Sequence, residues 1–226
     1  QEGINYAVSC LEADYVIIAN PDIHVPPRCI RRVKDALDKT QGAVAASARV
    51  KDPMGGELFS YWTLLPLWKD LLDTGLVTRR LFKAMLNTPS YRLAYAGDED
   101  SRLVDAVPGS FFMLKPGLLT PQDTEELFDS HIFLYYEEKV LGRKFQELGL
   151  KTVLVTDESY VHAHSVTIDK SLKRIVDKQR LLHRSKLYYY KEYLGTGPAG
   201  MAAARAVLGL VLAEVWFLTV VCRMRW

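Results

Sequence analysis

The sequence is poor in cysteine, and its three cysteines form no recognisable pattern. Cys10, Cys29 and Cys222 lie far apart, and none belongs to a C-x-x-C pair. This spacing argues against a disulfide framework and against a zinc site, and it favours a reducing compartment. The N-terminus lacks a basic stretch followed by an apolar run, so it does not read as a signal peptide.

The sequence also lacks a large excess of one charge. Its formal net charge is +2, from 29 Lys and Arg against 27 Asp and Glu, which is too small to indicate a nucleic-acid partner. Lys and Arg nevertheless crowd residues 170–191. Apolar residues make up 49% and charged residues 25% of the chain, as in globular proteins. The 226 residues suffice for one large α/β domain, or for an ordinary domain with a helical appendage.

Hydrophobic patterning predicts an α/β fold. Residues 15–19 and 43–50 read as buried strands, and the amphipathic segment 30–37 between them reads as a helix. This order predicts parallel pairing, and therefore a mostly parallel, Rossmann-like sheet flanked by helices. A later helix is expected to begin near Glu137 and to stop at Gly149. Further strands are expected at residues 104–107, 110–115 and 152–155.

The C-terminal part, residues 167–226, predicts two helices of different character. The first is basic and rich in Tyr, which suits an anionic membrane surface. In the second, residues 202–222 would span about 31 Å as a helix, enough for a bilayer core. Glu214 near its middle opposes a span, so we expect a tilted or interfacial helix. The alternative is an apolar helix packed on the domain or on a second subunit.

Three groups of polar residues could carry chemistry. Asp22 follows the first predicted strand, where open sheets bind ligands, although an Asp beside prolines is also a common turn former. Glu137 and Glu138 open a helix, whose dipole should keep a general base ionised at neutral pH, or they only stabilise that helix. His162 and His164 share one face of an extended segment, as metal ligands or substrate contacts do, although such residues are usually structural or solvated.

Five segments combine these groups in a recognisable order. They are residues 3–7 (GINYA), 15–22 (YVIIANPD) with 25–27 (VPP), 104–114 (VDAVPGSFFML), 128–129 (FD) with 133–138 (FLYYEE), and 161–162 (VH). Together they resemble the family 2 glycosyltransferases with a GT-A fold, in particular the bacterial rhamnosyltransferase-like members. The resemblance covers about residues 3–165 and implies a GT-A-like catalytic domain over residues 1–166.

The resemblance implies roles for the matching residues. Asp22 would hold Mg²⁺ or Mn²⁺ against the donor diphosphate, with Asn20 in place of the family's first acid and His162 completing the site. Glu138, with Glu137 beside it, would deprotonate the acceptor hydroxyl for in-line attack with inversion. The residues expected to contact substrate are Asn20, Asp105, Gly109, Ser110 and His164.

Two features depart from the family pattern. The family usually has Glu-Asp where this chain has Glu137-Glu138, and the extra methylene changes the reach of the base. The family also begins with a strand and a loop that grip the nucleotide base. This sequence starts after them, in the helix that contains Gly3, so we expect the catalytic domain to lack its first strands.

We therefore expect an inverting glycosyltransferase at the cytoplasmic face of the cell membrane. It would move a sugar such as rhamnose from a nucleotide-sugar donor to a glycan or lipid-linked acceptor in cell-surface polysaccharide synthesis. Expected partners are the membrane surface and a second copy joined through the C-terminal helices. The alternative is a non-catalytic, membrane-associated interaction module derived from a transferase domain.

Overall fold

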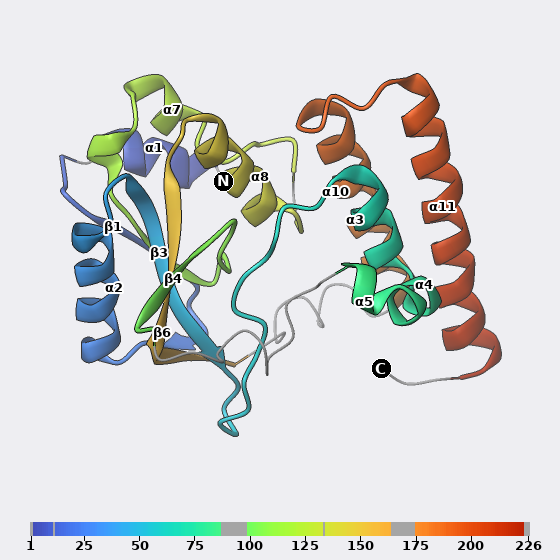
Figure 1. The fold of residues 1–226 in the computed structure, drawn as a ribbon, viewed down its shortest axis with the longest axis horizontal. Coiled ribbons are helices and arrows are strands. Elements are labelled where there is room, and N and C mark those ends of the chain that lie inside the picture. The colour runs from blue at the N-terminus through green and yellow to red at the C-terminus, as the bar shows by residue number, and fades with distance from the viewer. Residues whose placement is uncertain (1, 11, 87–98, 133, 164–174, 224–226) are drawn as a thin grey trace. The chain divides into compact units, whose positions relative to one another are not determined.

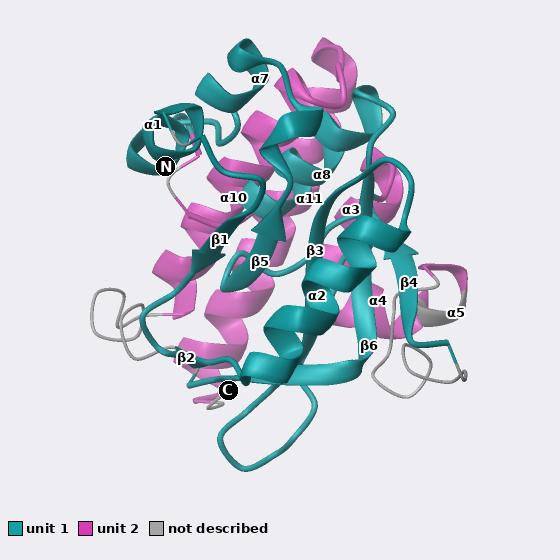
Figure 2. Cartoon of the chain, turned by 90° about the vertical axis from the view of Figure 1, so that its left-hand side faces the viewer, with its two compact units in different colours: residues 1–64, 89–131, 137–164 teal, residues 65–88, 132–136, 165–226 magenta. Residues whose placement is uncertain are grey.

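The computed structural model describes residues 2–10, 12–86, 99–132, 134–163 and 175–223 (Figure 1). The chain forms two compact units (Figure 2). Unit 1 consists of residues 1–64, 89–131 and 137–164, and unit 2 of residues 65–88, 132–136 and 165–226. The structure thus adds two earlier segments to the C-terminal helices that the sequence sets apart.

Unit 1 is an α/β unit built on a six-stranded sheet. Its strands are β1 (Val16–Ala19), β2 (Ile23–His24), β3 (Ala43–Lys51), β4 (Ser101–Val104), β5 (Phe111–Leu114) and β6 (Lys151–His162). They are hydrogen-bonded in the order β1-β5-β3-β6-β2, and β4 also pairs with β6. The β3 and β6 strands pair in parallel, and the other four pairings are antiparallel.

The prediction of a mostly parallel sheet is therefore wrong. Strands β1, β3 and β6 run in one direction, whereas β2, β4 and β5 run in the other. A strand, helix, strand sequence makes β1 and β3 run the same way, but it does not make them neighbours. Strand β5, which comes much later in the chain, lies between them, and the result is a mixed sheet.

Strand β1 also differs from the prediction in its burial. We expected a buried strand, but Ile17 and Ala19 are exposed while Val16 and Ile18 are half-buried. The strand lies at the end of the hydrogen-bonded order, with β5 as its neighbour on one side. An edge strand with one packed face alternates in this way, and an apolar run alone cannot distinguish it from a central strand.

Two apolar clusters form the core of unit 1. Helix α2 (Pro27–Lys39) contributes Cys29, Val33 and Leu37 to the first, together with Ala46 of the central strand β3. The three α2 residues are four positions apart, so they share one helical face. The second cluster holds side chains of helices α1 (Glu2–Cys10) and α8 (Glu137–Glu147). The other helical elements in the described part of the unit are helix α7 (Pro121–Glu125) and the 3₁₀ turn η1 (Pro116–Leu118).

Unit 2 is helical in the part that the structure describes. Its helices are α3 (Leu67–Thr74), α4 (Leu76–Leu81), α5 (Lys83–Leu86), α10 (Ile175–Glu192) and α11 (Pro198–Trp216), and a π-helical turn, η2 (Phe217–Val221), follows α11. Both predicted C-terminal helices are therefore present. The apolar one is long and apolar enough to cross a membrane, by length and composition alone.

A buried ion pair joins α10 to α3 inside unit 2. Lys186 of α10 lies 2.9 Å from the carboxylate of Asp70 in α3, and their side chains are only 6% and 2% exposed. The hydroxyls of Tyr136 and Tyr190 donate to the same Asp70 oxygen, at 2.5 and 2.6 Å. Lys186 also donates to the hydroxyl of Thr74. Charges this deeply buried are tolerated only when they are paired and hydrogen-bonded, as these are.

We expect Asp70→Asn to lower the free energy of unfolding by about 3 kcal/mol, because it leaves the Lys186 charge buried without its counter-ion. Urea denaturation followed by circular dichroism measures the change. Asp73→Asn is the control, because its partner Arg79 is 57% exposed and such a pair contributes less than about 1 kcal/mol. Adding Lys186→Met to Asp70→Asn should restore part of the loss. Equal stability of Asp70→Asn and Asp73→Asn would contradict a structural role for the buried pair.

Candidate active site

The loop after β1 brings Asp22 to His162. The backbone N–H of Asn20 donates to the carbonyl of Ser110 at 2.8 Å, which fixes the start of the loop. Strand β2 then pairs with the end of β6, so that Ile23 lies opposite His162. As a result the Asp22 Oδ1 and His162 Nε2 atoms are 3.3 Å apart. The structure thus places together the two residues that the sequence selects as metal ligands.

This pair has the chemistry of a partial metal site. A carboxylate oxygen and an imidazole nitrogen are both acceptable to Mn²⁺, and Mg²⁺ takes carboxylate oxygens together with water and phosphate. The 3.3 Å separation is close to the about 3 Å between neighbouring ligands of an octahedral ion. Among the described residues, no group of three or more His, Cys, Asp or Glu side chains could hold a metal ion. An ion bound here would complete its coordination from water or substrate.

The segment at the start of β5 connects this loop to the acidic helix. The Ser110 hydroxyl is buried and lies 2.7 Å from the hydroxyl of Tyr160, a fully buried residue of β6. Nothing in the sequence pattern singles out Tyr160, because an aromatic residue in a strand is common. The Ser110 side chain therefore supports the segment from inside, and its contact with substrate stays a prediction.

Glu138 reaches this segment from the first turn of α8. Its Oε1 accepts a hydrogen bond from the backbone N–H of Gly109 at 3.3 Å. A Cβ atom added to Gly109 would itself lie 3.3 Å from that oxygen, so glycine leaves room for the carboxylate. Hydrogen bonds thus join Glu138 through Gly109 and Ser110 to Asn20, two residues before Asp22.

The pKa values of Glu137 and Glu138 are higher than we expected from the sequence. Burial, followed by the neighbouring Glu138 charge, raises the pKa of Glu137 to about 8. Burial also raises the pKa of Glu138, although hydrogen bonds from backbone amides, including that of Gly109, and the charge of Lys139 act the other way. We expected the helix N-terminus to keep the base ionised, but loss of water outweighs the helix dipole here. Near neutral pH the two carboxyl groups therefore avoid carrying two full charges.

The backbone before α8 adopts an unusual conformation. Tyr135 and Tyr136 have φ angles of 66° and 75°, in the left-handed region that non-glycine residues rarely occupy. Each such residue costs about 1 to 3 kcal/mol and persists only where surrounding contacts hold it. The hydroxyl of Tyr136 is held by Asp70. Sequence patterns missed this feature, because two consecutive tyrosines normally indicate extended backbone.

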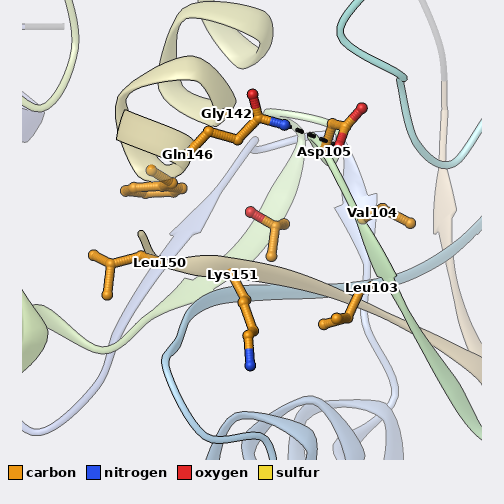
Figure 3. Close-up of a pocket in the computed structure, with 9 residues that line it drawn as sticks. Leu103, Val104, Asp105, Gly142, Gln146, Leu150 and Lys151 are labelled. Carbon is orange, nitrogen blue, oxygen red and sulfur yellow. Dashed lines mark hydrogen bonds between the residues drawn. The ribbon is translucent and has the colours of Figure 1, made fainter. Parts of the chain in front are cut away.

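Asp105 has a different environment from the other predicted residues. Its carboxylate accepts hydrogen bonds from the Leu64 backbone N–H at 2.8 Å and from the Gln146 side chain at 3.1 Å, beside a pocket of about 170 Å³ (Figure 3). Gly142 of α8 packs directly on the Asp105 carbonyl, where an added Cβ would lie at 2.3 Å. Asp105 therefore anchors α8, and its contact with substrate stays a prediction. His164 lies outside the described residues.

The raised pKa of Glu137 should make the free energy of unfolding depend on pH. Its proton is held more tightly in the folded protein, with a pKa of about 8, than at the ordinary value of 4.5. The resulting stabilisation is complete below pH 4.5 and is lost as the pH rises to about 8. Over this range the free energy of unfolding should fall more steeply for the wild type than for Glu137→Gln. Urea titrations at several pH values measure both slopes.

The matched control for this measurement is Glu125→Gln, which removes an exposed carboxylate on α7. It should retain the slope of the wild type. Equal slopes for all three proteins would show that Glu137 titrates as an ordinary surface carboxylate.

Comparison with known proteins does not identify a family for this chain. No protein-family model matches the chain, and no curated protein matches its sequence. The functional assignment therefore depends on the site itself, that is on the Asp22 and His162 pair and on Glu138 hydrogen-bonded to Gly109.

Proposed function

We propose that the chain is a GT-A-like catalytic domain that transfers a sugar from a nucleotide-sugar donor to a hydroxyl acceptor with inversion. The observation that carries this proposal is the 3.3 Å approach of Asp22 to His162, at the ends of two strands of one sheet. The five ordered sequence segments, which contain both residues, also support it. A site at the ends of sheet strands is where α/β proteins commonly bind nucleotides.

Asp22 and His162 would bind Mg²⁺ or Mn²⁺. When bound, such an ion stabilises the negative charge of a departing nucleoside diphosphate. Asp22 is partly exposed, with 30% of its side chain accessible, so phosphate oxygens and water can reach it. Asn20, which is exposed beside it, can donate its side-chain amide to a phosphate or sugar oxygen.

Glu138 would act as the general base. A base works best when its pKa lies near the working pH, and burial moves the pKa of Glu138 upward in that direction. The hydrogen bond from Gly109 orients Oε1. The acceptor hydroxyl would give its proton to this carboxylate as its oxygen attacks the anomeric carbon from the side opposite the diphosphate. Glu137, which holds its proton near neutral pH, lowers the negative charge next to the base.

The donor sugar would be a hexose or deoxyhexose such as rhamnose, and the acceptor a glycan or a lipid-linked saccharide. We place this reaction at the cytoplasmic face of the cell membrane, since helix α11 is apolar and the preceding helix is basic. A second copy of the chain is the alternative partner of the C-terminal helices. If the protein binds membranes but transfers no sugar, it is instead a non-catalytic interaction module.

The first test concerns Asp22. A nucleoside diphosphate should bind the protein that contains this chain only when Mg²⁺ or Mn²⁺ is present, because Asp22 and His162 reach the phosphates through the ion. Isothermal calorimetry with uridine and thymidine diphosphates, with and without metal, measures this dependence. Asp22→Ala should remove it, whereas Asp35→Ala, an exposed change on α2, should leave it intact. Identical binding by Asp22→Ala and wild type would remove Asp22 from the site.

The second test separates the two glutamates. Glu138→Gln keeps the size of the side chain but cannot accept the proton, so turnover should fall by about 10² to 10⁴-fold while donor binding changes little. Glu137→Gln should lower turnover less. Glu138→Asp shortens the side chain to the residue that the family usually has. Product analysis with a panel of nucleotide sugars measures turnover, and near-normal turnover in Glu138→Gln would mean that another group is the base.

A further inference from the structure

Helix α11 is apolar on both of its faces. Its buried side chains recur every three or four residues, which defines the face packed on the rest of unit 2. They are Met201, Ala204, Leu208, Val211 and Val215. The outward face is also apolar, with Leu210 72% and Trp216 50% exposed, and with Arg205 as its one charged side chain. A helix on a water-facing surface normally carries polar residues there.

The only acidic residue of α11 does not face away from the protein. Glu214 Oε1 accepts a hydrogen bond from the backbone N–H of Val77 at 3.0 Å, at the first turn of α4. The Glu214 side chain also approaches Gly75, where an added Cβ would lie 3.4 Å from Oε2. The acid that opposes membrane contact in the sequence is thus engaged with a neighbouring helix of the same unit.

This contact brings a second group of exposed apolar side chains to the C-terminal half of α11. Helix α4 begins beside that half, where Val77 bonds to Glu214, and α5 contacts α4 (Figure 1). They and the turn between them expose Val77, Leu81, Phe82 and Met85, with Leu81 at 73%. Trp216, Phe217, Val220 and Val221, also exposed, lie within a few residues of Glu214. We refer to the exposed apolar side chains of α4, α5, α11 and η2 as the α4–α11 surface.

We infer that the α4–α11 surface binds the headgroup region of an anionic bilayer, with α11 lying along the membrane and not crossing it. The inference deepens the membrane placement proposed above, and it does not depend on the transferase chemistry. Its basis is the exposed apolar surface together with exposed basic residues on, or next in sequence to, the same elements. The exposed basic residues are Arg80, Arg205 and Arg223, whose positive charges are attracted to the negative headgroups of anionic lipids. Tryptophan side chains such as Trp216 favour the depth of the lipid headgroups.

Packing within unit 2 argues against a membrane-spanning α11. Helix α10 packs along it, with Val176 in one apolar cluster with Val211 and Val215. If α11 crossed the bilayer, α10 would be drawn into the hydrocarbon with its exposed Arg180 and Arg184, which is strongly unfavourable. Lying in the interface, α11 can place its outward face in lipid while α10 keeps its charges in water.

A second copy of the chain is the rival occupant of the surface. A twofold interface would bring identical patches together, and with them Arg80, Arg205 and Arg223 of both copies. Like charges at the border of a dry interface oppose such a contact. Anionic headgroups instead provide the opposite charge, so lipid is the occupant that the exposed residues favour.

Vesicle flotation tests the surface. Wild type should float with vesicles of phosphatidylcholine and phosphatidylglycerol in equal parts, and less with phosphatidylcholine alone. Leu81→Asp and Leu210→Asp should each weaken vesicle binding by about 10-fold, because each puts a charge into the apolar contact. Leu118→Asp, at an exposed leucine of unit 1, is the control and should bind as the wild type does. Circular dichroism confirms that each variant is folded.

Three results would overturn the inference. The first is equal flotation of Leu81→Asp, Leu210→Asp and wild type. The second is a wild type that stays in solution as a monomer without lipid binding, and the third is a dimer that Leu210→Asp dissociates and that does not float. Flotation is read without any sugar donor, so a failure of glycosyl transfer leaves this result unaffected.

The native cysteines distinguish lying along the membrane from crossing it. Cys10 in unit 1 and Cys222 beyond α11 are exposed, whereas Cys29 is buried. With protein bound to sealed vesicles, a membrane-impermeant maleimide added outside should label both exposed cysteines. In the Cys10→Ser variant any labelling reports on Cys222, and in the Cys222→Ser variant it reports on Cys10. Labelling of Cys222 only after the vesicles are lysed would mean that α11 crosses the bilayer.

Discussion

The pairing of strand β6 with three other strands decides where the candidate site lies. This strand pairs in parallel with β3 from Lys151 to Val161 and antiparallel with β4 over Thr152 to Val155, and its last two residues pair with β2. The pairing with β2 brings Asp22 to His162, and the buried Tyr160, two residues earlier on β6, bonds to Ser110. A one-residue change of register would turn His162 to the opposite face of the sheet and break the pair with Asp22.

The second constraint is the burial of two adjacent carboxyl groups at the start of α8. Burial raises both pKa values, and in Glu137 the neighbouring charge adds to the effect. An oxygen of Glu137 is also buried without a hydrogen-bond partner in the described structure. Burying a protonated Glu137 costs less free energy than burying a charged one. Glu138 instead accepts a hydrogen bond from the backbone N–H of Gly109. The two glutamates are therefore not equivalent, although they are neighbours of identical chemistry.

The sequence patterns predicted where several helices and strands lie, but they did not predict which residues surround them. The helix from Glu137, its end near Gly149 and the strand that begins at Ala43 follow from local periodicity and capping, which depend on near neighbours in the chain. The position of β5 between β1 and β3, and the buried pair of Asp70 with Lys186, depend on residues far apart in sequence. So do the raised pKa values at α8, because burial is a property of the whole fold. Long-range pairing leaves little trace in one sequence, so these features appear only in the structure.

Unit 2 buries a cluster of polar groups and exposes the apolar outward face of α11. Asp70, Lys186, Tyr136 and Tyr190 place their polar atoms in the interior, where they bond to one another. The outward face of α11 meanwhile exposes leucine, tryptophan and phenylalanine. Keeping such a surface in water is unfavourable by about 25 cal/mol for each Å² of apolar area. That free energy is recovered when the surface leaves water, as it would in the lipid contact proposed above, and the interior pairing of Asp70 with Lys186 keeps those two charges away from the apolar face.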